Sequence, residues 1–261
     1  MEIDMLRRFI VLFVISLLMV SCRSIPKDVS PVAATWLYGV HALPASATVS
    51  GSTESFVPTY KNTLGADSAG KKLKPGVKVP IAIHLHGCAG MTTGNQHAEY
   101  QDLLLSQGYA VFMPDSFARP ERENLCGQGG LSDRIDTRIA EVRYALKQIR
   151  TLPWVDQKRM VLTGFSEGGN TVDNWPTDDF AGLVVLGSAC TKSGGSPIAP
   201  DNVPVLAIVG ELDDYRPGLS CSIKRTVGGS KSIVIPGADH YIALYTETQT
   251  AIKLFLKQCC K

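Results

Sequence analysis

Short, predominantly apolar runs recur along the chain from residue 79 onward, separated by segments with helical spacing. Six runs are typical of β-strands: Val79–Leu85, Tyr109–Met113, Met160–Thr163, Leu183–Leu186, Val205–Val209 and Ser232–Ile235. Their apolar residues mostly follow one another instead of alternating with polar ones, which predicts strands buried on both faces. Such strands belong to a mostly parallel sheet with helices on both faces, so the pattern predicts an α/β fold.

Three helices are predicted between and after these strands, in addition to a short helix directly after the Gly164–Gly168 segment. The first covers residues 98–106, and Gly108 follows it where a left-handed C-cap is wanted. The second begins at Ser132, has apolar residues at spacings of three and four, and ends before Pro153. The last is expected from Ile242 to Lys257. An open parallel sheet of this kind places its ligand site beyond the carboxyl ends of its strands.

The N-terminal third of the chain follows a different pattern. Arg7 and Arg8 precede an apolar stretch that ends near Val20, short for a membrane span and suited to a secretory signal peptide over residues 1–21. Residues 22–75 are rich in small and polar residues and are predicted to form a tether followed by irregular edge strands. The regular pattern then occupies residues 76–261, a length that fits one α/β domain.

The end of the apolar stretch, Met19-Val20-Ser21-Cys22, resembles the lipobox of bacterial lipoproteins. The resemblance implies cleavage before Cys22 and a lipid on its sulfur, so the protein is expected in the bacterial cell envelope, in the periplasm or at the outer membrane, anchored to a membrane. The alternative is a plain signal peptide with an incidental Cys22.

Six further cysteines agree with export, because an even set in an oxidising compartment indicates disulfides. Cys88 and Cys126 follow strands expected at the same sheet edge, and the same is true of Cys190 and Cys221, so these are the two plausible pairs. Cys259 and Cys260 have no assigned partner. No C-x-x-C pair is present, so no structural metal is expected.

The charge balance narrows the class of partner. The formal net charge is only +2, and no run of like charges appears. Nucleic-acid binding needs a clustered basic face, so a nucleic-acid partner is not expected. A small molecule is easier to reconcile with this balance, and the sequence gives no indication of the oligomeric state.

Gly164-Phe165-Ser166-Glu167-Gly168 matches the G-x-S-x-G nucleophile elbow and follows a predicted strand, as that motif requires. The turn presents the Ser166 hydroxyl, and a side chain at 164 or 168 is expected to collide with neighbouring backbone. The motif in this context predicts an α/β-hydrolase fold with Ser166 as the nucleophile.

A serine hydroxyl needs a base to take its proton and an acid to orient that base, and in this fold they follow in the order Ser, acid, His. His240 is the one histidine after Ser166, and it follows a strand. Asp213 stands three residues beyond Gly210, where such acids commonly lie; Asp214 and Glu211 remain alternatives.

The oxyanion of the reaction needs backbone N–H donors. The N–H of Glu167, directly after the nucleophile, is one candidate. The other is the N–H of Cys88 in the His86-Gly87-Cys88-Ala89-Gly90 loop, with Ala89 as the alternative. The Glu167 side chain is expected to play no catalytic part, being favoured at a helix N-terminus by the helix dipole.

These segments, taken in order, resemble the dienelactone hydrolase family: residues 84–90, 113–117, the Ser166 elbow, Asp213 and His240, within roughly residues 78–258. Dienelactone hydrolase itself uses a Cys nucleophile, so Ser166 indicates the serine esterase-like branches of the family. Arg119 and Arg122 are candidates to bind a substrate carboxylate, and exposed loop charges are the alternative.

The sequence therefore predicts a hydrolase of carboxylic esters, lactones or thioesters that forms an acyl-enzyme on Ser166 and needs no cofactor or metal. A peptidase of the same fold is one alternative. A non-catalytic envelope lipoprotein that uses a hydrolase-like fold for binding is the other.

Overall fold

The computed structural model describes residues 29–56, 69–91, 96–120, 122, 126, 131–190, 194–215 and 219–260 (of 131–133 the backbone alone). The predicted signal peptide and Cys22 lie outside these residues. Within the described part of the chain, no helix combines the length and apolar character needed to cross a membrane.

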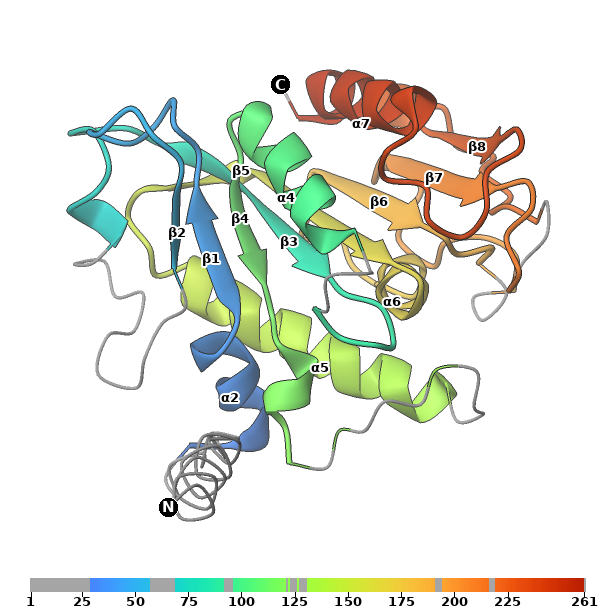
Figure 1. The fold of residues 1–261 in the computed structure, drawn as a ribbon, viewed down its shortest axis with the longest axis horizontal. Helices are drawn as coiled ribbons and strands as arrows, with labels where there is room; N and C mark the ends of the chain where they lie inside the picture. Colours follow the sequence, from blue (N-terminus) through green and yellow to red (C-terminus); the bar gives the residue numbers. More distant parts are fainter. Residues whose placement is uncertain are drawn as a thin grey trace, which may run out of the picture.

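An eight-stranded sheet forms the centre of the molecule (Figure 1). The strands are β1 (Val40–Leu43), β2 (Glu54–Phe56), β3 (Val79–Leu85), β4 (Ala110–Met113), β5 (Val155–Phe165), β6 (Gly182–Leu186), β7 (Val205–Gly210) and β8 (Lys231–Ile235). Their spatial order is β2-β1-β4-β3-β5-β6-β7-β8. Neighbouring strands from β4 to β8 are parallel, and β1 pairs antiparallel with β2 and β4. The predicted mostly parallel sheet is thus confirmed.

Helices cover both faces of the sheet (Figure 1). They are α2 (Pro31–Leu37), α4 (His97–Ser106), α5 (Leu131–Ile149), α6 (Glu167–Asp173) and α7 (Thr246–Cys259), with 3₁₀ turns η3 (Ser116–Ala118) and η4 (Val227–Gly229). Side chains of α2, α5 and α6 join one hydrophobic cluster, and those of α4 and α7 join the other. Leu183 and Val185 of β6 point into the first cluster and Val184 and Leu186 into the second, which explains the continuous apolar runs.

Two strand or helix starts differ from the prediction by several residues, and one helix was not predicted. β5 begins at Val155, earlier than Met160. α7 begins at Thr246, because the chain at Tyr245 is still extended (φ −70°, ψ 132°) and the Ala243 N–H donates to the Gln96 side chain. α2 was not predicted at all, although Ser30 caps it by accepting from the Ala33 N–H and Pro31 stands at its first position. Two strands precede residue 75, of which β2 lies at the edge of the sheet as expected and β1 lies inside it, paired with β2 and β4.

The two expected disulfides are present. Cys88 is joined to Cys126, and Cys190 is joined to Cys221. Cys259 is joined to its neighbour Cys260, the pair that had no assigned partner. The first two cross-links tie together loops at the carboxyl edge of the parallel strands, where the candidate site lies.

Candidate active site

Ser166 stands in a sharp turn between β5 and α6. Its backbone has φ 57° and ψ −114°, a conformation that non-glycine residues seldom adopt. Backbone strain of this kind is typical of functional sites. The turn is held by a hydrogen bond from the Ser166 N–H to the Leu186 carbonyl of 2.8 Å and by the first helical bond, from the Asn170 N–H to the Ser166 carbonyl. The geometry is that of a nucleophile elbow.

The glycines of the motif are required by the closeness of the backbone. A Cβ atom on Gly164 would lie 2.4 Å from the Gly168 carbonyl group, and one on Gly168 would lie 2.2 Å from the Leu85 carbonyl oxygen. Both distances are far below any real contact. The expected collision of side chains at these positions with neighbouring backbone is therefore confirmed.

Asp213 and His240 meet beside this turn. The His240 Nδ1 lies 2.6 Å from the Asp213 Oδ2, and both side chains are buried. A carboxylate accepts, so Nδ1 carries the proton and Nε2 is left as the acceptor that a base requires. The other carboxylate oxygen, Oδ1, accepts from the Tyr215 N–H at 2.8 Å, which holds the acid in place.

The two alternative acids lie elsewhere on the same loop. Glu211 is exposed and accepts a hydrogen bond from the Gly237 N–H, and Asp214 is exposed. Among the three carboxylates, Asp213 is the one that contacts His240. The acid loop and the histidine loop fit closely, since a Cβ on Gly210 would lie 2.0 Å from the Asp239 carbonyl oxygen.

The imidazole also lies close to the nucleophile turn. The ring of His240 lies 4.8 Å, centroid to centroid, from that of Phe165, the residue before Ser166. A Cβ on Gly187 would lie 3.1 Å from the His240 Cε1, and Gly187 follows Leu186, the residue whose carbonyl accepts from Ser166. The predicted base and nucleophile, 74 positions apart in the sequence, are thus brought to one edge of the sheet.

The candidate oxyanion donors belong to segments that adjoin the nucleophile. A Cβ on Gly87 would lie 3.3 Å from the Ser166 Cβ, so the loop that carries Cys88 runs directly alongside the serine. Glu167 is the first residue of α6, where a backbone N–H has no partner within the helix. Glu167 and Gly87, the residue before Cys88, thus lie next to Ser166, and the donor roles of Glu167 and Cys88 stay predictions.

From the sequence, the Glu167 side chain was expected only to interact favourably with the helix dipole at the N-terminus of the helix. It is instead buried, and its carboxylate pairs with three arginines: Arg122 at 2.5 Å, Arg138 at 3.2 Å and Arg134 at 3.4 Å. Sequence reasoning missed this cluster, because Arg138 lies 29 residues away on another helix and no local pattern links the two side chains. The one feature of the sequence that pointed to such a cluster was the charged residue Glu167 directly after the nucleophile.

Asp173 and the cysteines of the Cys190–Cys221 pair lie together, with their ligand atoms within 4.8 Å of one another. The two sulfurs form a disulfide, so they are not available as thiolate ligands. This group therefore offers a metal ion one carboxylate and no thiolate.

Comparisons with known proteins bear on this site. The model of the dienelactone hydrolase family matches residues 68–246, well over half of the chain. The chain belongs to this family. Comparison with curated proteins found no match.

Solved structures show the same fold at low sequence identity. A structure described as ferulic acid bound to Est1E from Butyrivibrio proteoclasticus is 19% identical, with a TM-score of 0.52, covering 70% of this chain and 91% of that one. The DcsB complex with its substrate analogue is 14% identical, with a TM-score of 0.50, covering 71% of this chain and 92% of that one. As a member of the dienelactone hydrolase family, the protein is a hydrolase with the α/β-hydrolase fold.

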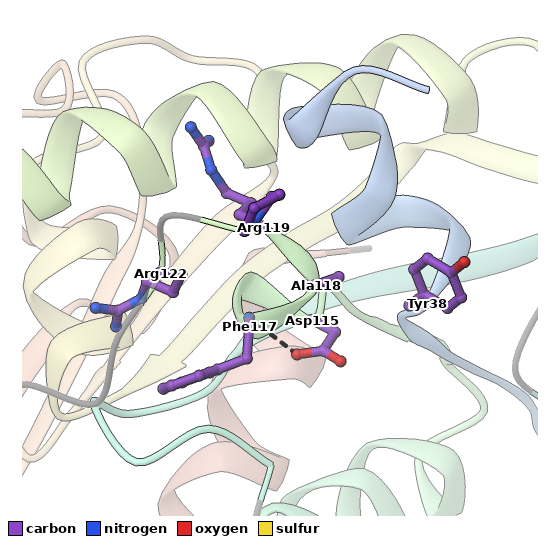
Figure 2. A pocket seen from close by; sticks show the side chains of 7 residues that line it. Tyr38, Asp115, Phe117, Ala118, Arg119 and Arg122 are labelled. Atoms are coloured by element: carbon purple, nitrogen blue, oxygen red, sulfur yellow. Dashed lines mark hydrogen bonds between the residues drawn. The ribbon is translucent and has the colours of Figure 1, made fainter. Parts of the chain in front are cut away.

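In this member of the dienelactone hydrolase family, Arg119 and Arg122 are not exposed loop charges. Their side chains are 16% and 5% exposed, and they pair with Glu141 at 4.0 Å and with Glu167. Both side chains line a cavity of about 490 Å³, whose other lining residues are Tyr38, Asp115, Phe117, Ala118 and Pro120. Figure 2 shows Arg119 and Arg122 at this pocket. Arg122 also lies over the Phe117 ring, 5.1 Å from its centroid.

Proposed function

We propose that this protein hydrolyses carboxylic esters through an acyl-enzyme on Ser166. The observation that carries the proposal is the buried hydrogen bond from His240 to Asp213 beside a strained serine turn. A binding protein has no need of this arrangement, whereas a serine hydroxyl becomes a nucleophile only with such a base.

The reaction follows from the roles of these groups. The Ser166 Oγ attacks the ester carbonyl carbon while its proton passes to the His240 Nε2, and Asp213 stabilises the imidazolium that forms. The oxyanion accepts hydrogen bonds from the N–H groups of Cys88 and Glu167. The intermediate collapses, the C–O bond breaks, and the alcohol leaves with the proton from His240. Water then attacks the acyl-enzyme by the same steps and releases the acid and free Ser166.

Labelling with a fluorophosphonate tests the proposal directly. The reagent forms a covalent bond with an activated serine, so intact-mass measurement is expected to show one adduct, located at Ser166 by peptide mapping. The Ser166→Ala protein is the matched control and is expected to stay unlabelled. A folded wild-type protein without label would favour the binding-protein alternative.

The same preparation distinguishes substrate classes. Nitrophenyl esters are expected to be hydrolysed faster than thioesters, lactones or peptide amides. Preferential cleavage of the amides would make the protein a peptidase of the same fold, since the acyl chemistry is shared and only the bound leaving group differs.

We also propose that the protein is exported and anchored by a lipid on Cys22. The lipobox-like Met19-Val20-Ser21-Cys22 supports this proposal, and so does the presence of disulfides, which persist mainly in oxidising compartments. In a bacterial host, Cys22→Ser is expected to abolish incorporation of radiolabelled palmitate and to move the protein out of the membrane fraction. Membrane association retained without Cys22 would contradict the anchor.

A further inference from the structure

A chain of buried polar groups begins at the carboxylate of Glu167, the residue whose N–H is one candidate oxyanion donor. The Glu167 Oε1 accepts from the Arg138 Nη1 at 3.2 Å, and Arg138 is fully buried. The Arg138 Nε in turn lies 3.1 Å from the Glu141 Oε2, one turn further along α5. The position of α6 relative to α5 is therefore set by a charged hydrogen bond, from Arg138 to Glu167, as well as by apolar packing.

This polar chain of side-chain contacts continues from α5 to the loop after β4. The Ser116 Oγ donates to the Glu141 Oε2 at 2.5 Å, and both side chains are buried. Burial raises the pKa of Glu141, an effect that Arg138, Ser116 and the neighbouring Arg119 oppose by favouring the charged form. The hydroxyl of Ser116 thereby links the start of η3 to the Arg138–Glu141 ion pair of α5.

The next link is His86. The Ser116 N–H donates to the His86 Nε2 at 3.1 Å, so Nε2 is unprotonated and the proton is on Nδ1. The Nδ1 then donates to the Gly87 carbonyl at 2.7 Å. Burial lowers the pKa of His86 well below its ordinary value, which keeps the ring in this neutral form.

The Gly87 carbonyl belongs to the same peptide group as the Cys88 N–H, the second candidate oxyanion donor. A trans peptide group is planar, and its C=O and N–H point in opposite directions. Holding the Gly87 oxygen therefore sets the direction in which the Cys88 N–H points. The chain from Glu167 to His86 thus begins at one donor and ends at the other.

A second connection joins the same two residues. Cys88 is bonded to Cys126, and Arg122, four positions earlier in the sequence, holds the Glu167 carboxylate at 2.5 Å. Arg122 and Cys126 therefore add one contact to each donor residue, an ion pair with Glu167 and a disulfide with Cys88.

We propose that Glu167, Ser116 and His86 are positioning residues that set the relative placement of the two oxyanion donors. The inference rests on the proposed function of Ser166 and adds side-chain roles to it. Complete loss of one donor costs about 10²–10³ in kcat. Misalignment of a donor is expected to cost less, on the order of 10- to 100-fold, and to act on kcat because the oxyanion exists only in the transition state and the tetrahedral intermediates.

Two variants of His86 separate positioning from bulk. His86→Phe keeps an aromatic ring but removes the imidazole donor to the Gly87 carbonyl, which retains its hydrogen bond from the Gly90 N–H. With a nitrophenyl ester, kcat is expected to fall about 10- to 100-fold while KM changes less than about threefold. His86→Asn keeps an N–H near the position of Nδ1 and is expected to recover part of the loss. The affinity for a boronic acid, whose adduct with serine places an oxygen in the oxyanion hole, should fall in parallel with kcat/KM.

Glu167→Gln tests the other end of the polar chain, and Ser116→Ala tests its middle. Both variants are expected to lower kcat by a similar factor with little change in KM. Asp179→Asn is the matched control, because it removes a carboxylate paired with an arginine, Arg150, at the surface; it is expected to leave kcat unchanged. If His86→Phe fails to fold, as judged by its thermal unfolding transition, Glu167→Gln and Ser116→Ala decide alone.

Unchanged kcat in the folded Glu167→Gln and Ser116→Ala proteins would overturn the proposal, as would a rise in KM at constant kcat. Full turnover by Ser166→Ala would be a failure of the proposed function instead. The two failures are distinguishable, because the second appears without any change to the polar chain.

Discussion

Ser166→Ala is expected to lower kcat for a nitrophenyl ester by about 10⁴-fold or more, to a residual rate that comes from binding and the oxyanion donors alone. The reason is that alanine lacks the hydroxyl oxygen that the turn with φ 57° carries, at a position where a Cβ on Gly87 would lie 3.3 Å from the Ser166 Cβ. The measurement is steady-state hydrolysis at saturating substrate.

The variant is expected to fold normally, because alanine keeps the Cβ and the turn is held by backbone hydrogen bonds. Its thermal unfolding transition should lie within a few degrees of that of the wild type. Ser222→Ala, at an exposed serine, is the control and should retain full activity. Wild-type turnover by Ser166→Ala would place the hydrolysis at another site.

The parts of the fold that could be predicted from the sequence are those with a local pattern. Strands buried on both faces are readable because every side chain along Leu183–Leu186 must be apolar, whichever way it points. The elbow is readable because backbone approaches of 2.2–2.4 Å to a hypothetical Cβ leave no choice but glycine at 164 and 168. The Asp213–His240 pairing followed from chain order and from the edge at which parallel strands end.

The parts that were missed depend on contacts between distant segments. The start of α7 at Thr246 is set partly by a hydrogen bond from Ala243 to Gln96, 147 residues away, which no periodicity reports. The buried pairing of Glu167 with arginines of α5 is of the same kind. A charged residue has the same local signature whether it is solvated or paired in the interior, and only packing distinguishes the two.

α2 is a different case, because its signal was local and was not used. Ser30 followed by Pro31 is a strong start signal for a helix, but the small and polar composition of the surrounding segment indicated a tether. The buried Trp36 and Leu37 show that this segment packs into the first hydrophobic cluster.

Asp213→Asn is expected to lower kcat by about 10⁴-fold while leaving KM within a few-fold of the wild-type value. The carboxylate accepts from the His240 Nδ1 at 2.6 Å and from the Tyr215 N–H at 2.8 Å, so both of its oxygens act as acceptors. An asparagine has one oxygen and one NH₂ group. If its oxygen stays with Tyr215, its NH₂ group faces Nδ1 and favours the tautomer whose Nε2 carries the proton and cannot accept one from serine.

The neighbouring acids supply the controls for this loop. Glu211→Gln and Asp214→Asn remove charges of the same sign one or two positions away, but neither side chain contacts His240, and both are exposed. We expect both variants to retain kcat within about threefold, because the interaction of exposed charges with the site is weakened by solvent. Equal losses in all three variants would mean that the loop acts through its total charge and that Asp213 has no specific role in orienting the imidazole.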